Sequence, residues 1–396
     1  MKAVVMGAGR IGCGLVGQLL RASGWEVTFV TRDPEVVANL NRNGHYHVLM
    51  TSAKQNQKVT VGGVNALAIN QESAVIDALA QADLIATAVC SQNLPAIAPL
   101  IARGLAGRTR PANVIAFENM PNAGNCLRRL VASMLPHGVD VDRHGFSGAV
   151  ISRMITRRIG NPSDAAPLTF IGDEVEDFVV DRTVLRAPLA EIIGMKLVDD
   201  YQAWVLRKLY TFSAGHATTA YLGWLKGYHY VHTAIRDREI RQAVLKAMKE
   251  GQKGLAAKFG KEFAGDQAEL DAIVARFENA AINDPIVRVA RDPQRKLGAD
   301  ERLVGAALLA EEAGVIPEQL ALVTAAALCF SSSGHAETCT ACFEKSKAAE
   351  ALNQICGLDA AHGFGRNVAK SWAQLAPSIL PGNLLLSLKQ HMWARA

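Results

Sequence analysis

The sequence predicts two domains: an α/β domain built on a doubly wound sheet, followed by a domain that is mostly α-helical. Three observations support this prediction. The chain has 396 residues, 49% of them hydrophobic, which is enough for about two domains with buried cores. Its first half alternates short β-branched runs with helical segments, which indicates a parallel sheet with helices on both faces. From about Val198 the patterns become long and amphipathic, which favours helices.

The expected strands follow one another along the first half of the chain. Four runs, each followed by a helical segment, are expected to form the parallel sheet: KAVVMG (2–7), EVTFVT (26–31), ADLIATAV (82–89) and NVIAFEN (113–119). Three later runs are expected to extend the same sheet: GAVISRMI (148–155), PLTFIG (167–172) and EDFVVDRT (176–183).

The second domain is expected to consist almost entirely of helices. Two long amphipathic patterns, at 199–225 and 239–259, are its clearest signals. The composition changes between Leu189 and Leu197, so we place the domains at 1–193 and 194–396.

Composition and charge narrow the class of partner. The net charge of +5 is small for this length and the basic residues are scattered, which favours a small-molecule ligand over nucleic acid. The N-terminus shows no signal-peptide pattern and no apolar run reaches the roughly 20 residues that span a bilayer, so we expect a cytoplasmic protein without a membrane segment. Seven scattered cysteines fit reduced thiols. His335, Cys339 and Cys342 have metal-like spacing, but they lack a recognisable fourth ligand, and no metal is expected.

A glycine-rich turn links the first expected strand to the first expected helix. Gly7, Gly9 and Gly12 have the G-x-G-x-x-G spacing that typically binds a dinucleotide. Gly7 would make the tight turn, Gly9 would let the backbone approach a pyrophosphate, and Gly12 would let helix and strand pack closely. We expect the whole turn, Gly7, Ala8, Gly9, Arg10, Ile11 and Gly12, to bind the cofactor. The alternative interpretation is a plain tight turn.

The end of the second expected strand bears on which nicotinamide dinucleotide binds. Thr31 stands where NAD-binding domains carry a carboxylate for the ribose 2′-hydroxyl, and Arg32 follows it. A hydroxyl beside a guanidinium suits a 2′-phosphate, so NADP is preferred over NAD. Asp33 is expected to be the N-cap of a helix that begins at Pro34. Alternatively, Arg32 is a solvated surface charge.

A lysine, a serine and a histidine recur in RKLYTFSAGH (207–216). On an α-helix Lys208, Ser213 and His216 fall within an arc of roughly 140°, so they can converge on one cleft. A lysine held among apolar neighbours and near other cations has a lowered pKa, as a proton-abstracting base requires. Alternatively, Lys208 is a surface lysine with a buried stem and His216 is a capping or core residue.

Several longer motifs resemble the polyol-specific long-chain dehydrogenases, the mannitol dehydrogenase family. The resemblance runs over nearly the whole chain, through MGAGRIGCG (6–14), ATAV (86–89), FENM (117–120), RKLYTFSAGHATTAYLG (207–223), RFEN (276–279), RVARDPQRKL (288–297), DERL (300–303) and CGLD (356–359). It implies a Rossmann domain followed by a helical domain, a nicotinamide cofactor without a metal, and an open-chain polyol or polyol phosphate substrate.

The resemblance also implies roles for individual residues. Lys208 resembles the general base that takes the hydroxyl proton, and His216 the residue that holds the reacting oxygen. Asn119 and Ser213 stand at the positions of two amides that donate to the developing alkoxide. The basic pair that would hold the far end of the polyol is Arg288 and Lys296, and further cofactor contacts would come from Thr87, Ala88, Val89 and Asn119. Alternatively, Asn119 caps the next helix, and the basic pair consists of solvated charges.

Three positions depart from the family pattern. Ser213 replaces an asparagine, Ser152 before Arg153 replaces an aspartate in the expected substrate region, and Cys13 replaces an arginine. These departures favour a paralogue with altered preferences, which leaves two alternatives open: a hexuronate reductase of the same superfamily, and a catalytically degenerate NADP(H)-binding sensor. We expect Ser152 and Arg153 to contact substrate, and the protein to be a monomer or a homodimer.

Overall fold

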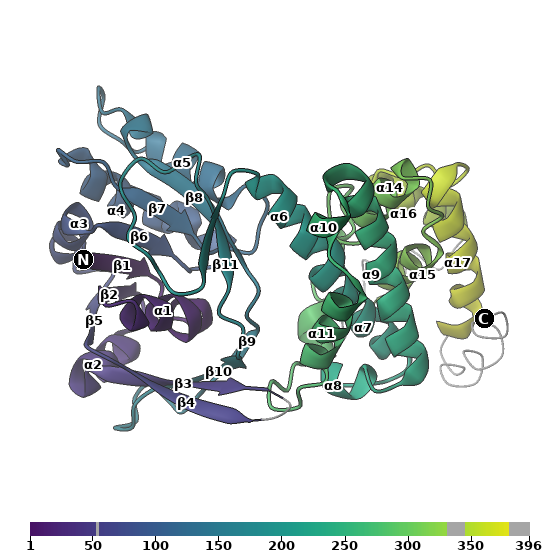
Figure 1. The fold of residues 1–396 in the computed structure, drawn as a ribbon, viewed down its shortest axis with the longest axis horizontal. Helices are drawn as coiled ribbons and strands as arrows, with labels where there is room; N and C mark the ends of the chain where they lie inside the picture. Colours follow the sequence, from purple (N-terminus) through teal and green to yellow (C-terminus); the bar gives the residue numbers. More distant parts are fainter. Residues whose placement is uncertain (53–54, 331–344, 380–396) are drawn as a thin grey trace. The chain divides into compact units, whose positions relative to one another are not determined.

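The computed structural model describes residues 1–52, 55–330 and 345–379. Contacts between Cα atoms divide the chain into two compact units, Met1–Val205 and Leu206–Ala396, which we call unit 1 and unit 2. Unit 1 is an α/β unit and the described part of unit 2 is helical (Figure 1). The predicted order of an α/β domain before a mostly helical domain is therefore confirmed.

Unit 1 is built on an eight-stranded sheet with the order β12-β11-β8-β7-β6-β1-β2-β5. Neighbouring strands are parallel except for β8 and β11. The strands are β1 (Lys2–Met6), β2 (Glu26–Thr31), β5 (Val64–Ala68), β6 (Leu84–Thr87), β7 (Asn113–Ala116), β8 (Gly145–Ile151), β11 (Phe178–Asp181) and β12 (Met195–Val198). Because β1 lies between β2 and β6, the strand order reverses at β1, which is the usual place for a ligand at the carboxyl ends of such a sheet.

A second sheet corrects one prediction. PLTFIG was expected to extend the large sheet, but β10 (Thr169–Asp173) lies in a separate four-stranded sheet with the order β4-β3-β10-β9. Its other strands are β3 (His45–Thr51), β4 (Asn56–Gly62) and β9 (Ile155–Ile159). The hairpin of β3 and β4 gives β10 a parallel partner, which its own sequence cannot reveal. The Tyr46 and Phe170 rings pack edge to face across this pair at 5.8 Å.

Helices cover both faces of the large sheet and form a separate hydrophobic core on each (Figure 1). Ala3 and Val5 of β1 belong to one core, and Val4 and Met6 belong to the other, because successive side chains of a strand point to opposite faces. The first core is covered by the π-helical segment η1 (Gly12–Gly17), α1 (Gln18–Ala22) and α2 (Pro34–Asn43). The second is covered by α3 (Glu72–Gln81), α4 (Leu94–Ala106) and α5 (Ala123–Ala132).

Unit 2 is arranged around one almost fully buried helix, α7 (Ala214–Leu225), which contacts α9, α12 and α15. Small residues make this packing close: a Cβ on Gly215 would lie 2.6 Å from the Met248 sulfur of α9. The other helical elements of the described chain from Tyr201 onward are α6 (Tyr201–Lys208), the π segment η4 (Leu209–Ser213), α8 (Val231–Ala234), α9 (Arg238–Phe259), α10 (Lys261–Ala264), α11 (Gln267–Phe277), α12 (Ile286–Ala290), α13 (Pro293–Lys296), α14 (Val304–Glu312), α15 (Glu318–Cys329), α16 (Lys345–Cys356) and α17 (Gly363–Ile379).

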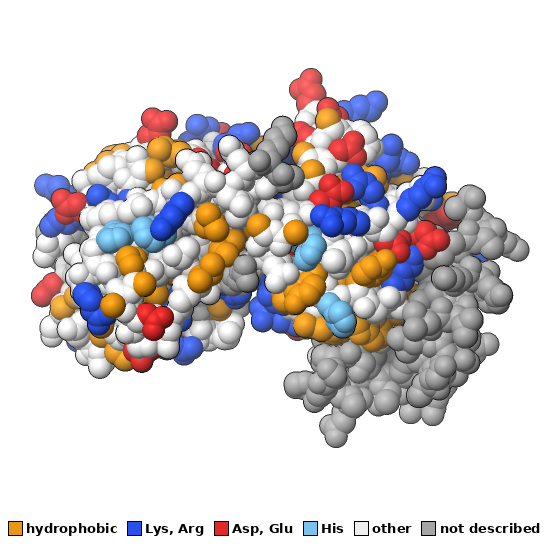
Figure 2. Space-filling model, turned by 90° about the horizontal axis from the view of Figure 1, so that it is seen from below, with side chains coloured by type: hydrophobic (Ala, Val, Ile, Leu, Met, Phe, Trp, Pro, Cys, Tyr) orange, Lys and Arg blue, Asp and Glu red, His pale blue; other side chains and the backbone are white. Residues whose placement is uncertain are grey.

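The surface and the described helices bear on the partner classes considered above. Figure 2 shows basic and acidic side chains interspersed over the face that it presents. Within the described ranges, no helix has both the length and the apolar character needed to cross a membrane. The same ranges contain no group of three or more His, Cys, Asp or Glu side chains that could hold a metal ion. The candidate zinc ligands His335, Cys339 and Cys342 lie outside the described residues.

Candidate active site

The glycine turn of unit 1 has the backbone that its spacing predicts. Gly7 has a φ of +115°, and an added Cβ would lie 2.4 Å from the Ala88 carbonyl oxygen at the end of β6. A Cβ on Gly12 would lie 1.8 Å from the Gly7 carbonyl oxygen. Both positions therefore require glycine, one for its conformation and contact with β6 and one for the close packing of helix against turn.

Gly9 differs from its two neighbours in the motif. A Cβ at this position would meet no atom within 4 Å, so the turn at Gly9 faces open space. The turn follows the carboxyl end of β1 and leads into Arg10, Ile11 and the π segment η1. An open backbone turn at the start of a helix fits the pyrophosphate of a dinucleotide. Arg10 donates from Nη1 to the Thr156 carbonyl at 2.9 Å, which ties the turn to β9.

The carboxyl ends of β6 and β7 are joined by a buried carboxylate that sequence reasoning missed. Glu118 is 5% exposed and accepts a hydrogen bond from the Thr87 hydroxyl at 2.7 Å and another from the Val89 backbone N–H at 3.0 Å. Burial raises the pKa of Glu118, while these two bonds lower it. The bonds fix the loop of Thr87, Ala88 and Val89 beside the glycine turn. The only sequence signal was its place in FENM.

Asn119 follows Glu118 and is exposed beyond the end of β7. The N-cap of α5 is Asn122, so Asn119 does not cap that helix. The structure therefore disagrees with the capping alternative and leaves the Asn119 amide at the same edge of the sheet as the glycine turn.

The end of β2 shows how its three polar residues differ. Asp33 is the N-cap of α2, accepting from Glu35 N at 3.1 Å and Val36 N at 3.2 Å, as predicted. Thr31 accepts a hydrogen bond from the Asp33 backbone N–H at 3.3 Å, so its hydroxyl hydrogen remains able to donate. Arg32 is exposed.

Arg153 lies in the interior of unit 1. Its side chain donates to the Val175 carbonyl at 2.6 Å, to the Gly14 carbonyl at 2.8 Å and to the Gln18 amide oxygen. Its pKa is lowered by burial. These contacts tie η1 and α1 to the segment after β10 and use the guanidinium within unit 1. Ser152, next to it, is half-buried.

Cys13, the departure in the glycine motif, is fully buried within η1. Its carbonyl accepts a hydrogen bond from the Tyr46 hydroxyl at 2.8 Å, and burial raises the pKa of its thiol. The Cys13 side chain belongs to the hydrophobic core that also contains Tyr46 and Phe170 of the small sheet.

The motif of Lys208, Ser213 and His216 lies on a helix that is not uniformly α-helical. α6 ends at Lys208, the π segment η4 covers Leu209–Ser213, and α7 begins directly after it. The phase of 3.6 residues per turn therefore does not apply between Lys208 and Ser213. A π turn is closed by i to i+5 bonds, so it reduces the rotation between residues five positions apart. Such segments are frequent at functional sites.

Unit 2 joins two of the predicted residues through Asp284, which was not predicted. The Asp284 carboxylate interacts with His216 Nε2 at 3.1 Å and accepts two bonds from Arg288, from Nε at 2.6 Å and from Nη2 at 2.5 Å. Its side chain is 3% exposed. Although burial raises the pKa of Asp284, its bonds with His216 and Arg288 hold it at about 2. Aspartate four residues before arginine was the available signal.

Lys208 has the electrostatic environment that a base requires. Burial lowers its pKa to about 8, helped by the positive charges of Arg302 and Arg276. Lys296 is 6% exposed, and burial together with Arg302 and Arg295 lowers its pKa to about 7. Lys296 donates to the carbonyl groups of Val289 and Arg291. Arg302, in the DERL motif, thus acts on both lysines.

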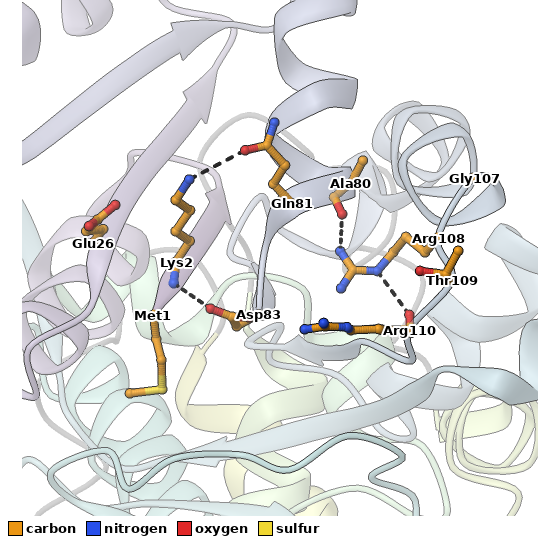
Figure 3. Close-up of a pocket in the computed structure, with 10 residues that line it drawn as sticks. All are labelled: Met1, Lys2, Glu26, Ala80, Gln81, Asp83, Gly107, Arg108, Thr109 and Arg110. Carbon is orange, nitrogen blue, oxygen red and sulfur yellow. Dashed lines mark hydrogen bonds between the residues drawn. The ribbon is translucent and has the colours of Figure 1, made fainter.

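A hollow lies elsewhere in unit 1, at the amino ends of the parallel strands (Figure 3). It has a volume of about 530 Å³ and is lined by Lys2, Glu26, Asp83 and the segment Gly107–Arg110, among others. Arg108 donates to the Ala80 carbonyl at 2.6 Å and Lys2 N to the Asp83 carboxylate at 2.8 Å, so several polar groups are already paired. The glycine turn and Asn119 lie at the opposite, carboxyl ends of the strands.

The chain matches two family models in succession. Residues 1–192 match the mannitol dehydrogenase Rossmann domain, and residues 200–362 match the mannitol dehydrogenase C-terminal domain. Together these matches cover most of the sequence.

Individual proteins give the same result. A mannitol-1-phosphate 5-dehydrogenase from Anoxybacillus flavithermus is 36% identical over 344 residues, which are 85% of this chain and 89% of that protein. The Pseudomonas fluorescens mannitol 2-dehydrogenase, solved with NAD and D-mannitol, shares the fold with a TM-score of 0.76 at 16% identity, covering 98% of this chain and 94% of that one. A D-sorbitol dehydrogenase in substrate-free form gives a TM-score of 0.74 at 16% identity, covering 97% and 94%. The chain therefore belongs to the mannitol dehydrogenase family.

Proposed function

We propose that this protein is a nicotinamide-dependent oxidoreductase that interconverts a secondary alcohol and a ketone on an open-chain polyol phosphate. The observation that carries the proposal is Lys208, whose pKa is lowered to about 8 by burial and by Arg302 and Arg276. A lysine tuned in this way is a proton acceptor that works near neutral pH. Membership of the mannitol dehydrogenase family and the 36% identity to a mannitol-1-phosphate 5-dehydrogenase support the choice of substrate.

In this proposal, Lys208 accepts the proton of the substrate hydroxyl, and the carbon that bears this hydroxyl gives up a hydride to the nicotinamide. The bound nicotinamide supplies the hydride chemistry, and the glycine turn of unit 1 would hold its dinucleotide. In the reverse direction, protonated Lys208 returns the proton to the ketone oxygen. Asn119 and Ser213 are the proposed donors to negative charge on that oxygen. Ser213 is buried and shorter than the asparagine of the family pattern, so its donation is the weaker of the two.

The cationic side chains of unit 2 favour a substrate that carries an anionic group at the end remote from the reacting hydroxyl. The predicted basic pair lies in two short helices, Arg288 in α12 and Lys296 in α13, and the positive charge of Arg302 acts on Lys296. Arg288 uses two of its five N–H donors on Asp284, which leaves donors for a phosphate. A carboxylate would also suit these cations, so hexuronate reduction remains the second candidate.

We propose that NADP is preferred over NAD. Asp33, which could repel a 2′-phosphate, points its carboxylate at the start of α2. Thr31 retains a hydroxyl hydrogen, and the exposed Arg32 supplies a guanidinium, and both groups suit a phosphate. We leave Arg153 out of the substrate site because its donors are used inside unit 1.

The test begins with calorimetric titrations of NADPH and NADH, followed by turnover assays with the preferred cofactor. The panel contains mannitol 1-phosphate, fructose 6-phosphate, their dephosphorylated forms and hexuronates. We expect tighter binding of NADPH and a higher kcat/KM for the phosphorylated pair. Equal or tighter NADH binding would overturn the cofactor choice, and preference for hexuronates would overturn the substrate choice. Cofactor binding without turnover of any compound would favour the degenerate NADP(H) sensor.

A further inference from the structure

Asp284 is a buried carboxylate of unit 2 that sequence reasoning did not assign. It lies just before α12, and both of its oxygens have partners: Arg288 bonds to both, and His216 bonds to Oδ2. We propose that Asp284 is a positioning residue that fixes His216 in the Nε2–H tautomer, so that Nδ1 accepts a hydrogen bond from a substrate hydroxyl. This inference rests on the proposed function for the identity of the hydroxyl group, but the tautomer itself does not.

The tautomer follows from the chemistry of the pair. Asp284 stays ionised at neutral pH, and an ionised carboxylate can only accept hydrogen bonds. At 3.1 Å the hydrogen between the two groups must therefore belong to His216 Nε2. In neutral imidazole the other nitrogen is then an acceptor. A histidine whose Nε2 is held by a carboxylate thus presents Nδ1 as a lone pair.

The charges around His216 keep the ring neutral. Burial lowers its pKa, Asp284 raises it, and the positive charges of Arg288 and Lys296 lower it again. Asp284 and Arg288 reach the ring from the segment before α12 and from α12, and Lys296 acts from α13. Phe277 of α11 and Phe212 of η4 pack on the ring, and Arg276 of α11 lies over Phe212 at 4.6 Å. Neutral His216 can accept through Nδ1 but cannot donate through it.

Two rings prevent His216 from exchanging its nitrogens by rotation. Phe277 of α11 stacks on the imidazole, with centroids 5.1 Å apart and planes inclined by 18°. Phe212 of η4 packs beside it at 5.7 Å. Turning the ring over would break the bond with Asp284 within this aromatic stack. The plane and the hydrogen-bonding direction of Nδ1 are therefore both set before substrate binds.

The arrangement has a consequence for substrate choice. Lys208 must take the proton of the reacting hydroxyl, and that hydroxyl has a single hydrogen to give. An acceptor at His216 Nδ1 therefore suits a second hydroxyl, on a carbon next to the reacting one, as a polyol carries. Asp284 also joins His216 to Arg288, so the group that binds this hydroxyl and the group that meets the anionic end are held by one carboxylate.

The first experiment determines the tautomer of His216 in the absence of substrate. Protein labelled with ¹⁵N-histidine is compared by NMR for the unaltered chain and for Asp284→Asn, with the His216 signals assigned by His216→Asn. We expect the unaltered chain to show Nε2–H with an unprotonated Nδ1, and Asp284→Asn to show a mixture of tautomers. An Nδ1–H tautomer in the unaltered chain, or an unchanged spectrum in Asp284→Asn, would overturn the proposal. This result stands even if no compound of the substrate panel is turned over.

The second experiment measures how substitution of Asp284 changes kcat/KM. We expect Asp284→Asn to lower kcat/KM by up to about 10⁴-fold, the loss in turnover that follows when a catalytic histidine loses the carboxylate that sets its tautomer. Asp284→Glu should recover part of that loss, because it restores a carboxylate. Asp292→Asn is the matched control, since Asp292 forms an i,i+3 pair with Arg295 and is about half exposed. A polyol phosphate lacking the adjacent hydroxyl should be a poor substrate for the unaltered chain and lose little more in Asp284→Asn. If the loss of kcat/KM from removing the hydroxyl and the loss from Asp284→Asn were independent, so that the two fold-changes multiplied, the proposed hydroxyl contact would be wrong.

Discussion

Lys208 is the residue whose protonation controls the direction of the proposed reaction. A neutral amine accepts the proton of an alcohol, whereas an ammonium donates a proton to a ketone. Because the pKa of Lys208 is lowered to about 8, we expect kcat/KM for alcohol oxidation to rise with pH up to about 8 and then level off. Ketone reduction should decline above the same pH. Steady-state rates in both directions between pH 6 and 10 measure the two limbs.

Substitutions separate the base from the charge of Lys208. Lys208→Ala should reduce turnover about 10²- to 10⁴-fold while NADPH affinity in a binding titration stays the same. Lys208→Arg keeps a cation but cannot lose its proton at these pH values, so it should be equally inactive. Lys249→Ala, on the exposed side of α9, is the control and should keep the profile unchanged. Full turnover in Lys208→Ala would remove Lys208 from the mechanism.

At the residue scale, the sequence indicated charged side chains better than it indicated their partners. Lys208, His216 and Arg288 were predicted as candidates, but Asp284 was not. An aspartate before a short helix looks like an ordinary cap until folding brings it against His216, 68 positions away. The same reasoning explains Arg153, which was expected to contact substrate. Its contacts with Gly14 and Gln18 come from residues 139 and 135 positions away.

At the scale of single elements, both predicted motifs lie on or beside π segments. η1 continues the glycine turn, and η4 separates Lys208 from His216. Composition cannot reveal a π turn, because the extra residue in the turn is stabilised by packing rather than by local preference. In η1 the packing is visible: a Cβ on Gly17 would lie 2.4 Å from the Phe29 ring and 2.7 Å from the Tyr46 hydroxyl.

The strand–turn–helix element predicts opposite results for two glycine substitutions. Gly9→Ala adds a Cβ that meets no atom within 4 Å, so the variant should unfold at the same temperature as the unaltered chain. It should nevertheless bind NADPH at least tenfold more weakly, because the methyl group occupies the space that the pyrophosphate needs. Gly12→Ala should instead lower stability, since its Cβ would lie 1.8 Å from the Gly7 carbonyl oxygen. Thermal unfolding and a binding titration on both variants check this pair.

The comparison within this pair is the control. Loss of NADPH binding in Gly9→Ala with unchanged unfolding supports a cofactor at the turn. If Gly9→Ala bound NADPH as tightly as the unaltered chain, the turn would not hold the pyrophosphate. If Gly12→Ala were as stable as the unaltered chain, the close approach of helix and turn would be wrong.

The strands show where sequence reasoning stops at the element scale. Alternation and β-branching identified six of the eight strands of the large sheet but missed β5 and β12, and the order of the predicted strands along the chain gave the doubly wound arrangement. PLTFIG was also recognised as a strand, but its sheet was assigned wrongly. Its parallel partner β3 lies more than a hundred residues earlier, and Thr51 of β3 donates to the Gly172 carbonyl across that interval. Pairing over such a distance depends on long-range packing, which no local pattern encodes.

At the scale of the whole molecule, each unit has its own buried residues. Unit 1 places its hydrophobic cores on the two faces of the large sheet, and unit 2 buries α7 among helices. A chain of this kind need not unfold in a single two-state step. The proposed cofactor contacts belong to unit 1, in the glycine turn and at the ends of β2, β6 and β7. Cofactor binding should therefore stabilise the part of the molecule that carries them.

We expect NADPH at about 100 times its Kd to stabilise unit 1 by about 2.7 kcal/mol. For a unit of about 200 residues this corresponds to a rise in Tm of roughly 5–10 °C. Differential scanning calorimetry measures the rise, and hydrogen exchange with mass spectrometry locates it. Protection should concentrate in Met6–Gly17 and at the end of β6, with the interior of α9 changing least. Gly9→Ala should show the same ligand-free scan and no rise with NADPH. A rise of equal size in that variant, or protection that leaves Met6–Gly17 unchanged, would place the dinucleotide elsewhere on the molecule.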